Sequence, residues 1–207
     1  MELRGSTRGR IAGTYPSEGE KLDLFEFILI ITSVIFALAV AQILSGISRI
    51  AQSMVRVELC LTHAVWGFNL FIFIFLIWWA SWEFRNVDWT FPKYAYMLIA
   101  PTLLYFACTL LVPQPLVGET ANMEDHFFRI RRPLFVAYFF AALVVIVDGV
   151  LLVDEALWHQ ARYGHLAILG LAGWGFFTSG RNAHKVIAIM NSLAIVGLIV
   201  FRFWSPA

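Results

Sequence analysis

Long apolar runs recur along the chain, and they constrain its fold more than any other feature. The first run, LFEFILIITSVIFALAVAQILSGISRIA, contains one acid and, near its end, one arginine. A helix of about 20 apolar residues is long enough to cross the hydrocarbon core of a bilayer. The runs therefore predict an all-α polytopic transmembrane helix bundle of about six spans, over residues 23–51, 61–84, 93–111, 133–153, 158–177 and 182–204.

The composition excludes most soluble classes. Apolar residues make up 60% of the 207 positions and charged residues 14%, whereas a soluble domain has about 45–50% and 25%. The net charge of +1 provides no basic field for nucleic acid. We expect a flexible tail over residues 1–21, one transmembrane domain over 22–207, the lipid bilayer as the main partner and no contact with nucleic acid.

Basic residues set the expected orientation. Six spans place both termini at one end of the bundle, called the terminal end below; the other is the opposite end. Arg129, Arg131 and Arg132 follow one another closely in a connection that reaches the opposite end. Cytoplasmic loops of membrane proteins are rich in Lys and Arg, so these arginines favour termini on the outer side.

The same connection contains a helix signal. Asn122 has the side chain of a helix cap, and Asp125 follows it by three residues. The basic and aromatic residues that come next suit an interfacial helix. They suit equally well a basic flank before the fourth span, for which Pro133 is a favourable first residue.

Charged residues inside the spans are the best candidates for a functional site. Asp148 lies in the run VVIVDGVLLV, while Glu26 and Glu83 are expected near the terminal end. Ionisable groups within a membrane are costly, and they indicate a function or an ion pair. One interpretation is a polar vestibule for a cation or proton. The other is a structural pair between Asp148 and Arg162 or Arg202.

The first span carries small residues at every fourth position: Ser33, Ala37, Ala41 and Ser45. This spacing forms a shallow stripe on one side of a helix, along which another helix backbone can approach closely. We therefore predict that the stripe is a helix-packing surface.

Two histidines open spans that begin at the opposite end, His63 in the second and His184 in the sixth. Facing histidines can ligate a haem iron from both sides, so haem b is one alternative and plain interfacial histidines are the other. The sequence contains no GxSxG, HExxH, P-loop or CxxC motif. We therefore predict no metal site and no catalytic residues, and an enzyme is not favoured.

Three segments carry a resemblance: FALAVAQILSGISR (36–49), WWASWEFRNVDWTF (78–91) and APTLLYFACTLLVP (100–113). They resemble stretches of small bacterial polytopic inner-membrane proteins to which no activity is assigned. The resemblance covers most of the first three spans. It implies a multi-pass protein of the bacterial inner membrane, and it transfers no site.

Three functions remain open from the sequence. The leading hypothesis is a small channel or transporter for a cation or a proton. Such a protein could act as a subunit or as a homo-oligomeric bundle. The second is a non-catalytic structural or assembly subunit of a larger membrane complex. The third is a haem- or pigment-binding membrane protein that uses His63 and His184.

Overall fold

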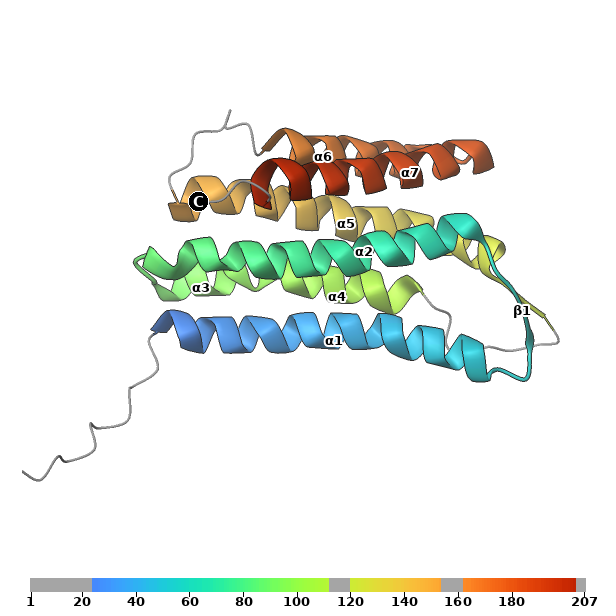
Figure 1. Cartoon of the computed structure of the whole chain (residues 1–207), viewed down its shortest axis with the longest axis horizontal. Helices are drawn as coiled ribbons and strands as arrows, with labels where there is room; N and C mark the ends of the chain where they lie inside the picture. The colour runs from blue at the N-terminus through green and yellow to red at the C-terminus, as the bar shows by residue number, and fades with distance from the viewer. Residues whose placement is uncertain (1–23, 112–119, 154–161, 204–207) are drawn as a thin grey trace, which may run out of the picture.

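The structure, a computed structural model, describes residues 24–111, 120–153 and 162–203, apart from the side chains of residues 153, 202 and 203. Long helices run side by side and alternate in direction along the chain (Figure 1). They are α1 (Leu24–Gln52), α2 (Leu61–Ala80), α4 (Ile99–Leu111), α5 (Met123–Val153), α6 (Arg162–Phe177) and α7 (Arg181–Leu198).

Shorter elements lie at the two ends of the bundle. The terminal end, on the left in Figure 1, has the 3₁₀ turn η1 (Ser81–Asn86), the start of the short helix α3 (Phe91–Met97) and the π-helical turn η2 (Ile199–Phe203). At the opposite end, β1 (Arg56–Glu58) pairs in parallel with β2 (Thr120–Asn122). The two strands join the loop after α1 to the start of α5.

Five helical segments of the described chain are long and apolar enough to cross a membrane by their length and composition. They are Leu24–Gln52, Leu61–Asn86, Phe91–Leu111, Met123–Leu152 and Arg181–Phe201. The predicted class, an all-α bundle of membrane spans, is confirmed. The remaining expected span corresponds to α6, which has 16 residues and so is shorter than the usual 20; residues 158–161 of that expected span lie outside the described chain.

Buried apolar side chains from all six long helices form the core of the bundle. Helix α4 packs between α1 and α5, α5 also packs on α6, and α2 contacts α1, α4, α5 and α7. Trp66 of α2 meets the rings of Phe135 and Tyr138 of α5 edge-on, with centroids 4.9 and 5.4 Å apart. Edge-to-face aromatic pairs add to the stability that burial alone provides, so these rings hold the middle of the bundle.

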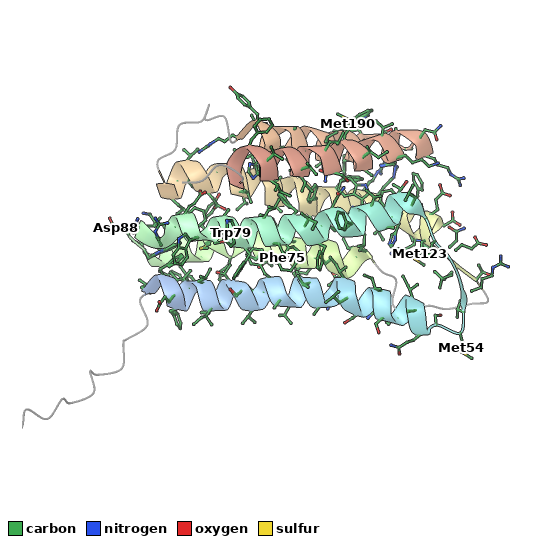
Figure 2. All side chains as sticks on the ribbon, viewed as in Figure 1. Met54, Phe75, Trp79, Asp88, Met123 and Met190 are labelled. Atoms are coloured by element: carbon green, nitrogen blue, oxygen red, sulfur yellow. The ribbon has the colours of Figure 1, made fainter. Side chains whose placement is uncertain are left out.

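The outer surface of the bundle is apolar. Side chains such as Phe75, Trp79 and Met190 are 46%, 65% and 47% exposed, and apolar side chains project outward around the helices (Figure 2). A water-soluble protein rarely exposes apolar surface on this scale. Because every long element is a helix that satisfies its own backbone, the same surface suits lipid.

Helix α5 begins earlier than the sequence suggested. Asn122 caps it, because its Oδ1 accepts from the backbone N–H groups of Glu124 and Asp125 at 2.9 and 3.0 Å. The predicted cap is therefore confirmed. The helix then continues through Pro133, so the basic segment is the first part of a spanning helix and not a separate interfacial helix.

Candidate functional site

A small cavity lies inside the terminal end of the bundle, lined mostly by apolar side chains together with four ionisable residues. About 50 Å³ of it is accessible to water, which is room for a few water molecules. Helices α2, α5, α6 and α7 and the turn η1 surround it. The lining residues are Phe73, Leu76, Ile77, Ala80, Glu83, Phe84, Val145, Ile146, Asp148, Gly149, Arg162, His165 and Leu198.

Asp148 is the buried acid of this cavity. Its side chain is 6% exposed, and its Oδ1 is buried without a hydrogen-bond partner. One turn earlier, the carbonyl of Val144 accepts a hydrogen bond from the hydroxyl of Tyr96 at 3.2 Å. A carboxyl oxygen in this position has lost its hydration without replacing it, so it is poised to bind a proton, a water molecule or a cation.

Arg162 provides a positive charge in the same cavity wall. It is the first residue of α6 and is 3% exposed. Its Nη1 donates a hydrogen bond to the carbonyl of Ile146 at 3.1 Å. Within the described chain, no hydrogen bond or ion pair joins Arg162 to Asp148, although both line the cavity. Asp148 and Arg162 thus share the cavity wall without a contact between them in the described chain. The other suggested pair, between Asp148 and Arg202, stays a prediction, because the side chain of Arg202 lies outside the described residues.

Glu83 and His165 complete the polar lining. Glu83 lies in η1 and His165 lies one turn after Arg162 on α6; both are half-buried. Sequence reasoning did not select His165 as a site residue. The signal that identifies it is its spacing, because residues three apart on a helix lie on the same side, and Arg162 was already a candidate.

The structure places two other candidates away from this cavity. Glu26 is exposed and lines a separate hollow beside Phe25, Ser33 and Trp82. The three acids therefore do not share one vestibule, because Glu26 lies on the outer side of α1. The side chain of Arg202 lies outside the described residues.

Most of the small-residue stripe of α1 faces away from the bundle. Ser33 is half-buried and accepts a hydrogen bond from Nε1 of Trp78 at 2.8 Å. Ala37, Ala41 and Ser45 are exposed. The helix packs instead through another face, whose buried residues are Phe25, Ile28, Thr32, Phe36, Ala39, Ile43 and Gly46. Apart from Ser33, the residues of the stripe thus do not belong to the buried face of α1 in the described part of the chain.

The two candidate haem ligands have protein neighbours. Nε2 of His63 lies 2.5 Å from the carbonyl of Leu111, and Nε2 of His184 lies 3.2 Å from that of Thr178. The ring of His184 also packs against three phenylalanines of α5, Phe127, Phe128 and Phe135. These contacts favour a structural role, in which the imidazoles tie α2 and α7 to neighbouring carbonyls.

No cluster suited to a metal ion is present among the described residues, taking groups of three or more His, Cys, Asp and Glu. In comparisons with known proteins, no family model, curated protein or solved structure matches the chain. The fold and the site alone define its class. It is a multi-pass integral membrane protein built as a helical bundle, with a small cavity at one end that contains four ionisable side chains.

Proposed function

We propose that this protein moves protons within the membrane and that Asp148 carries the proton. The observation that supports this most directly is the buried Oδ1 of Asp148, which has no hydrogen-bond partner and belongs to a residue lining the cavity. A carboxyl group in a water-sized space can take a proton from water and return it. Ionisable residues inside membrane proteins commonly mark such relays.

The cavity suits a proton better than a metal ion. Its volume of about 50 Å³ leaves no room for a full hydration shell. Arg162 places a fixed positive charge in the same wall, and that charge repels a second cation at short range.

Glu83 and His165 provide a route to this carboxyl group. Both residues line the same cavity as Asp148, and both are half-buried, so they connect the buried acid with less buried positions. At the wall of the cavity, the ring of Phe73 packs against that of Tyr138, with centroids 5.3 Å apart. A proton can therefore pass this point only when these rings move, so the proposed pathway is gated and is not an open pore.

Proton flux into liposomes tests this function. The purified protein is reconstituted around a pH-sensitive dye, and a potassium diffusion potential drives protons inward. We expect Asp148→Asn to lower the flux at least tenfold, on the order of the effect of removing a proton-transfer group. Asp125→Asn is the matched control, because Asp125 is an exposed acid at the other end of the same helix.

Two results would contradict the proposal. One is a wild-type flux no greater than that of empty liposomes. The other is an Asp148→Asn flux equal to that of the wild type, with both proteins eluting as the same single species in gel filtration. A parallel assay that measures the flux of sodium ions instead of protons distinguishes a proton pathway from a general cation pathway.

A structural or assembly subunit is the second candidate. The outward stripe of Ala37, Ala41 and Ser45 on α1 supports it, because small residues permit close approach of another helix. Gentle-detergent purification from native membranes tests this alternative. Other chains that co-purify in fixed proportion and are lost with Ala41→Phe would support it, and a chain that purifies alone would contradict it.

A further inference from the structure

One outer face of α5 carries both cationic and apolar side chains. It lies at the opposite end of the bundle, away from the cavity. Arg129 and Arg132 are exposed there and are three residues apart, so they lie on the same side of the helix. Val136 and Phe140 follow on that side and are 42% and 49% exposed. The face thus changes from basic to apolar along its length.

Helix α6 forms the other wall of this face. The guanidinium of Arg132 lies over the ring of Phe176, 6.0 Å from its centroid. Further along, Gly173 approaches the ring of Phe139, to which an added Cβ would lie 3.9 Å away. A Cβ added at Gly170 would meet nothing within 4 Å. Gly170 therefore faces open space, and Gly173 lies next to α5. The outer face of α5 from Arg129 to Phe140, together with the neighbouring side of α6, is below called the α5–α6 seam.

The length of α5 places its arginines near the headgroups. The candidate span Met123–Leu152 has 30 residues, whereas about 20 cross the hydrocarbon core. The first turns, which contain Arg129 and Arg132, can therefore extend into the headgroup layer. Val136 and Phe140 then lie at the depth of the acyl chains.

Arg129 and Arg132 are available to a ligand, because no neighbouring acid pairs with them in the described chain. Arg131 is occupied on the other side, where its Nη1 donates to the carbonyl of Thr178 at 2.6 Å and to Oγ of Ser179 at 3.1 Å. Glu124 pairs with Arg181 at 3.3 Å. Asp125 lies one turn before Arg129, but no ion pair joins them in the described chain. The seam therefore keeps a net positive charge.

We propose that the α5–α6 seam binds an anionic phospholipid. The guanidinium groups of Arg129 and Arg132 contact the phosphate and its anionic headgroup, because guanidinium binds phosphate through paired N–H donors. One acyl chain lies along Val136 and Phe140 and over Gly173. A phospholipid fits better than a protein partner, since the change from basic to apolar along the face follows the layers of a bilayer leaflet. The site is separate from the cavity and does not depend on the proposed proton function.

Lipid binding to the purified full-length protein tests this site. The probes are fluorescent phosphatidylglycerol and fluorescent phosphatidylcholine with identical acyl chains, followed by anisotropy in a mild detergent. We expect phosphatidylglycerol to bind more tightly, and the double variant Arg129→Gln, Arg132→Gln to weaken its binding about 30-fold, the factor expected for two interfacial charges. Glycerol 3-phosphate should not compete, because it lacks the acyl chains.

The matched control is the double variant Arg56→Gln, Lys185→Gln, which removes two exposed charges from the same end of the bundle. It should bind phosphatidylglycerol like the wild type. If both double variants bound phosphatidylglycerol equally weakly, the proposal would be overturned, because binding would then depend on the general surface charge. Equal affinity for the two lipids would also overturn it, and competition by glycerol 3-phosphate would indicate a free-phosphate site instead. Restored binding in Arg129→Lys, Arg132→Lys would support the proposal and show that the seam still folds.

Discussion

Arg162 reaches across from α6 to α5 and donates a hydrogen bond from its Nη1 to the carbonyl of Ile146 at 3.1 Å. Ile146 lies two residues before Asp148, so this hydrogen bond ties the guanidinium to the backbone of the helix that carries the acid. The positive charge is therefore held in the cavity wall whether Asp148 carries a proton or not. This arrangement allows the acid to change its protonation state without losing a structural bond.

The first prediction concerns the contribution of Arg162 to stability. We expect Arg162→Met to lower the free energy of unfolding by about 1.5–3 kcal/mol, because a hydrogen bond from a charged donor is lost inside the bundle. Titration of the micellar protein with dodecyl sulfate, followed by far-UV circular dichroism, measures the change. Arg85→Met is the control, since Arg85 is an exposed arginine at the same end, and it should stay within about 0.5 kcal/mol of the wild type.

A second prediction compares two glycines of α6. A Cβ added at Gly175 would lie 2.5 Å from the ring of Phe135, whereas one added at Gly170 would meet nothing within 4 Å. Phe135 is fully buried and has little room to move. We therefore expect Gly175→Ala to cost about 1–3 kcal/mol through overpacking.

Gly170→Ala should be neutral or stabilise the protein by up to about 1 kcal/mol, because alanine favours a helix over glycine. The same dodecyl sulfate titration measures both variants. If the two substitutions had equal effects, the close packing of α6 on α5 at Gly175 would be refuted.

Hydropathy alone predicted most of the spans. The first expected range, 23–51, corresponds to Leu24–Gln52, and the third, 93–111, corresponds to Phe91–Leu111. These ranges are accurate because the apolar runs end at charged or helix-breaking residues. The start of α5 was missed because Pro133 also suits a first turn. A spanning helix tolerates an internal proline when its neighbours stabilise it.

The inward face of each helix was harder to predict. On α1 the buried residues include Phe36 and Ile43, while Ala37 and Ala41 face outward. Lipid tails are as apolar as a protein core, so hydrophobicity does not distinguish the two faces. The cavity was predictable only in part: Asp148 was evident as a charge within an apolar run, whereas its distance from Glu26 depends on how the helices pack.

The third prediction concerns a polar contact between α2 and α7. Nδ2 of Asn69 donates to the carbonyl of Ala188 at 3.1 Å, and Oγ of Ser192 donates to Oδ1 of Asn69 at 2.7 Å. A double-mutant cycle of Asn69→Ala and Ser192→Ala should give a coupling of about 0.6 kcal/mol, the average for interhelical hydrogen bonds in membranes.

Ser81 supplies the control for this cycle. It lies 12 residues after Asn69 along the chain, which is about 18 Å along a helix. Asn69→Ala and Ser81→Ala should therefore be additive. A cycle for Asn69 and Ser192 that is also additive would contradict the hydrogen bond between them.

The last prediction is the orientation of the bundle. In the described chain, the basic residues at the opposite end outnumber the acids Glu58, Glu124 and Asp125; they are Arg49, Arg56, Arg129, Arg131, Arg132, Arg181 and Lys185. Because basic loops stay in the cytoplasm, this end should face inward when the protein is expressed in bacteria.

Cys60 reports on this orientation. It is half-buried just before α2 at the opposite end, whereas Cys108 is 1% exposed in the core. A membrane-impermeant maleimide should label Cys60 in inverted vesicles and not in intact cells, and Cys60→Ser should remove that labelling. Cys108 should react only after denaturation. Labelling of Cys60 in intact cells would show the opposite orientation, with the arginines of α5 outside the cell.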